Sequence, residues 1–277
     1  MLQTNFTMGK DLLKGKRGII FGALDANSIA WKTAEKAHEE GATFVLTNAP
    51  IALRMGALDQ LAQDTGSTII PADATNNEDL EKLISQAVET LGGPLDFILH
   101  SIGMSPNVRK GKPYSDLNYD WFHKTLDVSA MSLHRVLQTA YRLDAMAEWG
   151  SVISLSFVAA QRAFPGYNDM ADAKSLMESI TRNFGYQYGN KKKVRVNTIS
   201  QSPTLTTAGK GVGGFDQFIN FAEDISPLGN ASAEQCADYT VMMFSDYTRM
   251  VTMQNLFHDG GFSFTGISEK VMKKYGM

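Results

Sequence analysis

The sequence predicts an α/β fold: a single doubly wound, Rossmann-type domain with a seven-stranded parallel sheet and helices on both faces. Short apolar runs alternate with segments of helical period along most of the chain, and nothing resembles a linker or a repeat. Such alternation is typical of βαβ units, whose parallel strands are buried on both faces. One domain of this kind can absorb all 277 residues.

The expected strands are short runs rich in apolar and β-branched residues: Arg17–Phe21, Thr43–Thr47, Thr68–Ala72, Phe97–Leu99, Ser151–Leu155, Val194–Ile199 and Met250–Leu256. The expected helices between them carry apolar side chains at helical spacing: Ser28–Glu40, Arg54–Asp64, Asp79–Leu91, Asp116–Met146, Tyr167–Tyr188 and Ala233–Ser245. The run Thr75-Asn-Asn-Glu78 reads as a capping box that opens the third of these helices.

One long segment, residues 203–227, lacks clear periodicity. It contains four glycines between Gly209 and Gly214, and a short helix is expected at Asp216–Ala222. A long loop inside a compact domain is usually a lid or a binding loop. We therefore expect a substrate-binding lid here that is mobile until ligands order it, the alternative being a surface excursion without function.

Composition excludes several classes of protein. Apolar residues make up 43% and charged residues 20% of the chain, which excludes a disordered or fibrous protein. The net charge of −3 argues against a general binder of nucleic acid or anionic membranes. The single cysteine, Cys236, excludes a disulfide framework and a thiolate zinc cluster, and no metal site is predicted. Without a signal-peptide core or an apolar run near about 18 residues, we expect a cytoplasmic protein.

The turn after the first strand could hold a phosphate, although the G-x-G-x-x-G fingerprint is absent. Gly22 lets the backbone turn sharply, and Ser28 can cap the next helix and offer a hydroxyl group. Ile29 and Ala30 supply N–H groups at the helix N-terminus, where the helix dipole favours an anion. A glycine and a cap occur at many such turns, so these residues alone do not decide the matter.

Three further positions follow expected strands at the edge of the sheet where dinucleotides bind. Asn48 ends the second strand, where an acid normally holds the adenosine ribose, and Asp73 follows the third and could accept from the adenine amino group. The segment His100–Gly103 ends the fourth strand, and Gly103 would let the backbone approach a flat ring. Each position has an ordinary structural explanation, but their order favours a dinucleotide site.

A tyrosine and a lysine share one face of the helix that begins near residue 167. Tyr167 and Lys174 are seven residues apart, about 20° short of two helical turns. The phenol can hydrogen-bond an oxygen that gains negative charge; the ammonium can favour that charge, lower the phenol pKa and reach ribose hydroxyls. A second pair, Tyr188 and Lys192, has Y-x-x-x-K spacing but lies in a basic run that reads as a solvated helix terminus.

Together these residues resemble the enoyl-acyl-carrier-protein reductases of bacterial fatty-acid synthesis, a divergent branch of the short-chain dehydrogenase/reductases. The resemblance covers about residues 10–265, with these markers: Gly22 followed by Ser28-Ile29-Ala30, His100–Gly103, Tyr167-x6-Lys174, Ser202-Pro203 and His258–Phe262. The x6 spacing is the most specific, because ordinary members of the superfamily use x3. In that register the tyrosine position holds Met170, which favours enoyl over carbonyl reduction.

The resemblance implies roles for the matching residues, with Tyr167 and Lys174 catalytic. The cofactor, NADH, would be bound by Gly22, Ser28, Ile29, Asn48, Asp73, Ala74, Ser101, Ile102, Gly103, Lys174, Thr204, Leu205, Thr206, Thr207 and Ala208. The acyl pocket would be bordered by Met104, Ser105, Phe157, Met170 and Phe215. Many relatives carry a second tyrosine where this chain has Phe157, so we expect no acid role for residue 157. Asp127 replaces the superfamily's usual helix asparagine, so we expect no proton relay through residue 127.

The expected reaction is reduction of the C2=C3 double bond of trans-2-enoyl thioesters of acyl carrier protein in fatty-acid elongation. NADH is favoured over NADPH because no arginine directly follows Asn48; Arg54 is the nearest. The resemblance also implies a homotetramer in which the helices Asp116–Met146 and Tyr167–Tyr188 pack against their mates. The alternatives are a carbonyl (3-oxoacyl) reductase, which would need a Y-x-x-x-K pair, and a non-catalytic dinucleotide-binding sensor.

Overall fold

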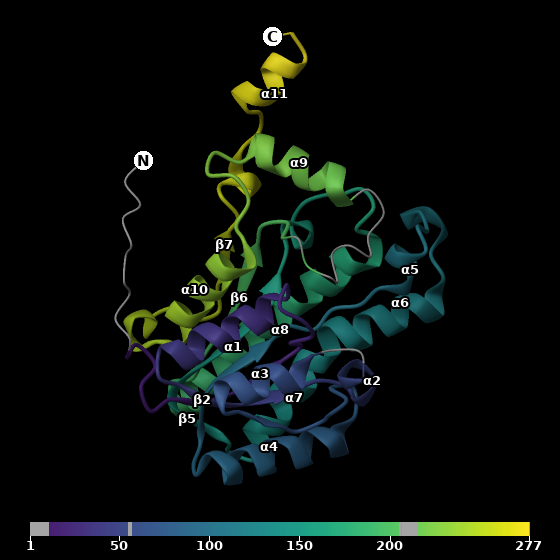
Figure 1. Ribbon diagram of the computed structural model, residues 1–277. Coiled ribbons are helices and arrows are strands. Elements are labelled where there is room, and N and C mark those ends of the chain that lie inside the picture. Colours follow the sequence, from purple (N-terminus) through teal and green to yellow (C-terminus); the bar gives the residue numbers. More distant parts are fainter. Residues whose placement is uncertain (1–10, 55–56, 205, 207–214, 277) are drawn as a thin grey trace.

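Seven parallel strands form one sheet in the order β3-β2-β1-β4-β5-β6-β7, which confirms the predicted doubly wound α/β fold (Figure 1). The computed structural model describes residues 11–54, 57–204, 206 and 215–276, with the backbone alone at 215 and 216. The strands are β1 (Arg17–Phe21), β2 (Thr43–Thr47), β3 (Thr68–Ile69), β4 (Leu95–His100), β5 (Met146–Ser156), β6 (Arg195–Gln201) and β7 (Asn255–His258).

Helices cover both faces of the sheet. They are α1 (Ile29–Glu39), α2 (Pro50–Leu53), α3 (Leu58–Thr65), α4 (Asn77–Leu91), α5 (Pro106–Arg109), α6 (Tyr119–Leu126), α7 (Ser132–Arg142), α8 (Asn168–Lys192), α9 (Phe215–Ile225), α10 (Ala233–Phe244) and α11 (Glu269–Lys274). A π-helical turn at Asp127–Met131 joins α6 to α7. Figure 1 places α9 and α11 at the top of the view, away from α4 at the bottom.

Two apolar cores, one on each face, hold the layers together. Because neighbouring residues of a strand point to opposite faces, Ile19 packs with α4, α7 and α8, and Ile20 packs with α1, α3 and α10. Both side chains are fully buried. Fully burying a side chain of this size contributes roughly 1.5–3 kcal/mol, so the two cores fix the sheet between its helices.

Several boundaries differ from those predicted. The expected helix Arg54–Asp64 is split into α2 and α3, and the third strand ends at Ile69. Asn76 rather than Thr75 caps α4, because the Asn76 side chain accepts from the backbone N–H groups of Glu78 and Asp79. The prediction that Thr75 is the cap was wrong.

The C-terminal half shows the larger differences. The expected helix to Met146 ends at Arg142, and Met146 already pairs with Leu95 as the first residue of β5. The helix α8 continues to Lys192, and the last strand begins at Asn255. The interpretation of Tyr188 and Arg195 as part of a solvated terminus was wrong, since each side chain is only 2% exposed.

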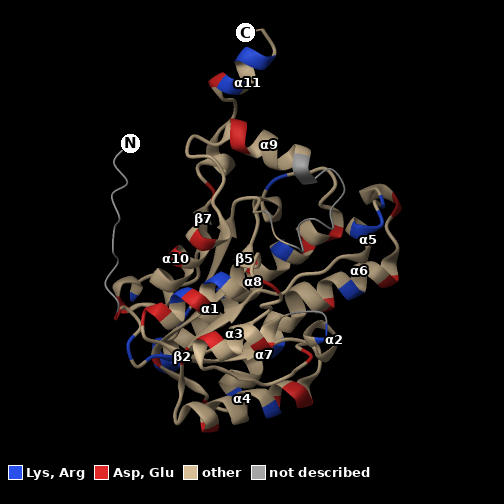
Figure 2. Cartoon of the chain, in the orientation of Figure 1, with Lys and Arg blue, Asp and Glu red and all other residues tan. Residues whose placement is uncertain are grey.

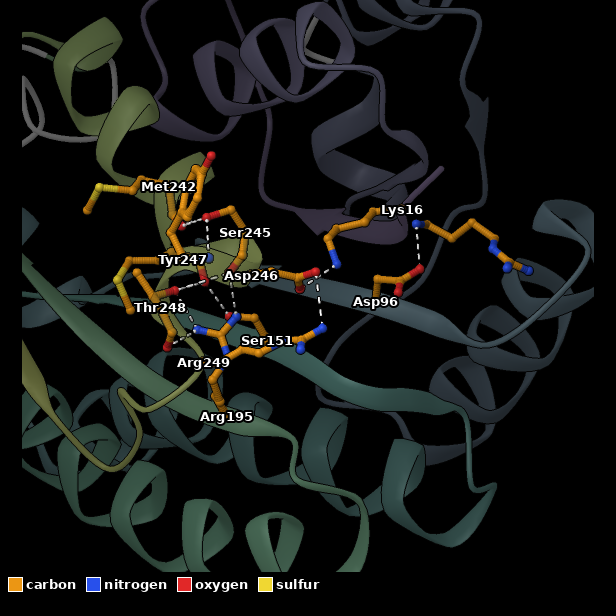
Figure 3. A network of polar contacts seen from close by, with 12 residues as sticks. Lys16, Asp96, Ser151, Arg195, Met242, Ser245, Asp246, Tyr247, Thr248 and Arg249 are labelled. Carbon is orange, nitrogen blue, oxygen red and sulfur yellow. Dashed lines mark hydrogen bonds and ion pairs between the residues drawn. The ribbon is translucent and has the colours of Figure 1, made fainter. Parts of the chain in front are cut away.

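Arg195 belongs to a polar network at the amino ends of the strands, opposite the edge where ligands bind in this fold (Figure 3). Its guanidinium donates to the carbonyl oxygens of Ser245 and Thr248 and to the Thr248 hydroxyl. Asp246 pairs with Lys16 at 3.0 Å and with Arg249 at 3.2 Å. Burial lowers the pKa of Arg195 to about 10. The network ties the start of β6 to the end of α10.

Lys and Arg residues are interspersed with Asp and Glu residues along the helices in the view of Figure 2, as the near-balanced composition leads one to expect. No helix in the described part of the chain is long and apolar enough to cross a membrane.

Candidate active site

The order of the strands reverses at β1, which has β2 on one side and β4 on the other. Gly22 follows β1 with φ +90°, and a Cβ atom there would lie 2.0 Å from the carbonyl oxygen of Ser101, which follows β4. Only glycine fits this backbone conformation and this close approach. Ligands of doubly wound proteins bind in the crevice at such a reversal.

The N-terminus of α1 faces this crevice. The Ser28 hydroxyl caps the helix by accepting from the N–H of Trp31 at 3.3 Å and donates to the carbonyl oxygen of Asp25 at 2.8 Å. The N–H groups of Ile29 and Ala30 lie in the first turn, where no helix carbonyl can accept from them. The turn at Gly22 and the N-terminus of α1 at Ser28 and Ile29 together form a cradle that suits the pyrophosphate of a dinucleotide.

Asn48 and Asp73 lie on the same crevice and already have partners within the chain. The Asn48 amide donates to the carbonyl oxygen of Ala23 at 3.0 Å and accepts from the N–H of Ala49 at 2.9 Å. The Asp73 carboxylate accepts from the N–H and the hydroxyl of Thr75 at 2.8 and 2.7 Å. Each side chain keeps spare capacity, a second amide N–H in Asn48 and a second oxygen in Asp73.

One cleft of about 1450 Å³ brings these residues together with the predicted catalytic pair. The predicted site residues that line it are Gly22, Ser28, Ile29, Asn48, Asp73, Ala74, Ser101, Ile102, Gly103, Met104, Ser105, Phe157, Tyr167, Met170, Lys174, Thr204 and Thr206. Leu205 and the stretch 207–214 of the predicted lid, which includes Thr207 and Ala208, lie outside the described residues, as does the side chain of Phe215. The roles of all these residues remain predictions.

Lys174 is a buried cation. Its Nζ atom donates to the carbonyl oxygen of Leu155, at the end of β5, at 2.6 Å. A Cβ atom at Gly103 would lie 2.7 Å from Cε of Met170 and 3.9 Å from Nζ of Lys174, so this glycine keeps space open beside the ammonium. Burial lowers the pKa of Lys174 to about 8, although the charge of Glu178 opposes the shift. Perturbed side chains in a cleft are candidates for function.

Tyr167 stands at the entrance to α8 as its N-cap residue. Its ring packs against Phe157 at 4.9 Å and against Phe164 at 6.0 Å between centroids. No group in the described part of the chain hydrogen-bonds its hydroxyl, and burial raises the pKa of the phenol far above its usual range. At neutral pH the phenol is therefore a protonated hydrogen-bond donor with no partner among the described residues.

His100 lies behind the cleft and carries no charge at neutral pH. The Ser132 hydroxyl donates to the carbonyl oxygen of Val128, so the His100 Nε2–H donates to Ser132 at 2.8 Å. Burial and then the charge of Lys174 lower the pKa of His100 to about 3. Lys174 therefore has no competing cation at this position.

The π-helical turn fixes the loop that follows β4. The Ser129 hydroxyl accepts from the N–H of Met104 at 2.9 Å and donates to its carbonyl oxygen at 3.1 Å. Asp127 lines the cleft and pairs with Arg135 at 2.6 Å. Such turns are frequent at functional sites, but helical periodicity in the sequence does not reveal them.

Sequence reasoning missed Asp169, a fully buried carboxylate in the first turn of α8. It accepts from the hydroxyls of Ser105 and Thr125 at 2.7 and 2.8 Å and from the Asn107 amide at 2.9 Å. The predicted substrate residue Ser105 thus has its hydroxyl hydrogen engaged inside the protein. Asp169 ties the loop after β4 and the helix α6 to the helix that bears the catalytic pair.

Two aromatic wall residues were also missed. Phe164 and Phe218 line the cleft, and with Phe157 and Tyr167 they form a continuous aromatic cluster. Phe218 comes from α9, far along the chain, so no local pattern connects it to the others. The sequence signal for Phe218 was the amphipathic pattern of α9, because the apolar face of such a helix normally packs against other apolar side chains.

The second tyrosine and lysine of α8 have their partners in the core and at the surface, not in the cleft. Tyr188 donates through its hydroxyl to the carbonyl oxygen of Leu137 at 2.8 Å. Lys192 pairs with the carboxylate of Asp144 at 2.7 Å and donates to the carbonyl oxygen of Met146 at 3.1 Å. Neither residue lines the cleft.

No cluster of histidine, cysteine and acidic side chains suited to a metal ion exists among the residues that the structure describes. The lone cysteine, Cys236, is buried, and burial raises the pKa of its thiol to about 12. A thiol in that state is a poor nucleophile and a poor metal ligand.

Comparison with known proteins gives one consistent result. The family model described as Enoyl-(Acyl carrier protein) reductase matches residues 22–263. The NADH-dependent enoyl-[acyl-carrier-protein] reductase FabI of Rickettsia bellii is 32% identical over 268 residues, which cover 96% of this chain and 100% of that protein.

Solved structures show the same similarity to enoyl-[acyl-carrier-protein] reductases. The crystal structure of the FabI–NADH complex from Alistipes finegoldii has 60% sequence identity and a TM-score of 0.94, covering 96% of this chain and 95% of that one. The NADH-dependent enoyl reductase of Aquifex aeolicus has 31% identity and a TM-score of 0.85, covering 92% and 99%. By its sequence and its structure, the chain belongs to the enoyl-(acyl carrier protein) reductase family.

Proposed function

We propose that this chain reduces the C2=C3 double bond of trans-2-enoyl thioesters of acyl carrier protein, with NADH as the reductant. The observation that carries the proposal is the convergence, on one cleft, of the Tyr167 phenol, the buried Lys174 ammonium and the glycine turn at Gly22. The phenol has no hydrogen-bonding partner in the part of the chain that the structure describes. Family membership and the relatives confirm the NADH-dependent enoyl reductase predicted from the sequence.

The cleft residues fit the pyrophosphate and the adenosine of the cofactor. The cradle at Gly22, Ser28 and Ile29 would take the pyrophosphate, and Asn48 and Asp73 have spare hydrogen-bonding capacity for the adenosine. Arg54, the nearest arginine after Asn48 in the sequence, is exposed and does not line the cleft, so it is not placed to receive a 2′-phosphate. When bound, NADH supplies the hydride that C3 of the substrate receives.

The chain's own residues stabilise the charge that this reduction creates. Tyr167 would donate its hydroxyl proton in a hydrogen bond to the thioester oxygen as that oxygen becomes an enolate. Lys174 would hold the nicotinamide ribose and add positive charge beside the phenol. Phe157 offers no second hydroxyl, and its ring instead keeps water from one side of Tyr167.

The geometry argues against the carbonyl reductase alternative. That reaction would need its Y-x-x-x-K pair beside the cofactor, whereas Tyr188 and Lys192 have their partners in the core and at the end of α7. A non-catalytic sensor would have no use for a cleft lined by both a buried ammonium and a phenol that has no partner among the described residues.

One assay tests the proposal. Crotonyl and longer enoyl thioesters, and then acetoacetyl thioester, are each offered with NADH, and NADH oxidation is followed by its absorbance. Turnover of the enoyl substrates alone is the expected result. Turnover of acetoacetyl thioester alone, or NADH binding without turnover of either, would contradict it.

The homotetramer implied by the resemblance and the cytoplasmic location expected from the sequence remain proposals. The mass in solution, measured by light scattering, tests the first, and a mass of one chain would contradict it.

A further inference from the structure

A second cavity, of about 560 Å³, lies beside the catalytic cleft. Its lining is dominated by apolar side chains, including five phenylalanines contributed by the loop before α8, by α9 and by the segment after β7. Nothing in the reaction described above uses this space. Its position beside the acyl side of the cleft raises the question of what occupies it.

Three residues, Phe164, Pro165 and Phe218, line both cavities and therefore form the partition between them. The rings of Phe164 and Phe218 meet edge-to-face, with centroids 4.7 Å apart and planes at 87°. Phe164 and Phe218 are each only partly buried. The partition thus depends on ring packing, which a rotation of either side chain can open.

The aromatic cluster also gives a continuous apolar path from the phenol to the second cavity. Tyr167 packs on Phe157, and Phe157 packs on Phe164 at 5.2 Å. Beyond the partition, Phe218 meets Phe262 at 6.0 Å, and Phe262 lines the second cavity. An apolar chain attached to a thioester at Tyr167 could follow these aromatic rings to the second cavity.

The polar groups of the second cavity already have partners inside the protein. The Ser263 hydroxyl donates to Asp259, and the Thr265 hydroxyl donates to the carbonyl oxygen of Gly261 at 2.9 Å. The Arg162 guanidinium donates to the carbonyl oxygen of Gln161 at 3.1 Å. Arg162 is exposed and is the one charged residue among the described lining residues, and most of the others are apolar, so the cavity suits a hydrocarbon better than a sugar.

We propose that the second cavity is a subsite for the distal methylenes of long acyl chains, and that Phe164 and Phe218 form the gate to it. The inference rests on the proposed reduction of enoyl thioesters. A short crotonyl group ends before the gate, whereas the chain of a dodecenoyl thioester reaches past it. Each methylene buried beyond the gate raises kcat/KM about fourfold, which corresponds to about 0.8 kcal/mol.

Gly266→Trp tests the subsite without altering the cleft. Gly266 lines the second cavity only, and a Cβ atom there meets no atom of the described residues within 4 Å, so an indole can project into the space. Gly189→Trp is the matched control. Gly189 is equally open, lies in α8 and lines neither cavity.

The measured quantity is the ratio of kcat/KM for dodecenoyl to kcat/KM for crotonyl thioester. We expect Gly266→Trp to lower this ratio at least tenfold and Gly189→Trp to leave it unchanged. An unchanged ratio in Gly266→Trp, with NADH binding intact, would overturn the subsite.

Should that variant fail to fold, Phe221→Glu places a charge on the half-exposed wall of the same cavity and must also lower the ratio. Crotonyl turnover by the parent chain separates the two hypotheses, because its absence would contradict the proposed function itself.

Discussion

A tyrosine and a lysine lie at each end of α8, but the two pairs differ in burial and in hydrogen bonding. At the N-terminal end, the Tyr167 hydroxyl faces the cleft with no partner among the described residues. At the C-terminal end, the Tyr188 hydroxyl is buried and donates to the carbonyl oxygen of Leu137. A hydroxyl that is open to a cleft can take a ligand as its hydrogen-bonding partner, whereas the Tyr188 hydroxyl already has a partner in the core.

The two lysines repeat the contrast. Lys192 has a carboxylate and two carbonyl oxygens as partners at the surface. Lys174 has one carbonyl oxygen, is almost fully buried, and has its pKa lowered to about 8. A residue that serves folding is fully paired, whereas one kept for function remains under-paired at some cost in stability.

Lys174→Met should have the largest effect. Methionine keeps the length of the apolar stem and removes the charge that holds the ribose and favours the enolate. We expect kcat/KM to fall about 10³-fold or more, with weaker NADH binding, because two interactions are lost where one oxyanion donor alone is worth about 10²–10³. Thermal stability should not fall, since a buried charge is removed.

Lys192→Met is its matched control. The lost ion pair lies at the surface, so we expect a change of about 0–1 kcal/mol in the free energy of unfolding and unaltered kinetics. Steady-state kinetics and thermal melting of both variants check the contrast. Equal losses of activity in the two would remove the distinction between the ends of α8.

Asp169→Ala tests what holds the N-terminal end in place. The change leaves the donors of Ser105, Asn107 and Thr125 without their buried acceptor, and we expect a loss of about 3 kcal/mol in the free energy of unfolding. Asp172→Ala, three residues on, breaks only an exposed contact with Tyr114 and should cost less than about 1 kcal/mol. Urea unfolding measures both, and equal values would contradict the role assigned to Asp169.

Tyr188→Phe should cost stability and spare catalysis. The carbonyl oxygen of Leu137 loses its buried donor, and we expect the free energy of unfolding to fall by about 1–2 kcal/mol. The kcat for an enoyl thioester should stay within about twofold of the parent value when measured well below the melting temperature.

The smallest effect concerns pH. Lys174 is charged below its pKa of about 8 and loses its proton as the pH rises through that value, so kcat/KM for NADH should decline above about pH 8. His100, with its pKa of about 3, stays neutral over this range and does not contribute to the pH dependence of kcat/KM. The decline should be absent in Lys174→Met. A flat profile in the parent enzyme from about pH 7 to about pH 9 would argue against the charge on Lys174.

The sequence predicts the part of the site that follows strand ends, because parallel strands bring their carboxyl ends to one edge. Gly22, Asn48, Asp73 and Ser101 are separated along the chain and still line one cleft. The fold class follows in the same way from the alternation of strands and helices. Helical spacing likewise places Tyr167 and Lys174 on one face.

Features that depend on distant contacts are not predictable in this way. Met146 begins a strand and not the end of a helix because it pairs with Leu95, which local periodicity cannot show. Asp169 lies in the x6 interval of the motif, and only the folded chain brings its three donors to it. The partition needs Phe164 and Phe218 from separate segments, so no window of sequence contains it.

The most direct test of the central claim is the kcat of Tyr167→Phe with an enoyl thioester and saturating NADH. The hydrogen bond to the enolate oxygen is strongest in the transition state, so we expect kcat to fall about 10²–10³-fold, or about 2.7–4 kcal/mol, while the Kd for NADH stays unchanged. An unaltered kcat in Tyr167→Phe, beside an inactive Tyr188→Phe, would contradict the account and transfer catalysis to the other end of α8.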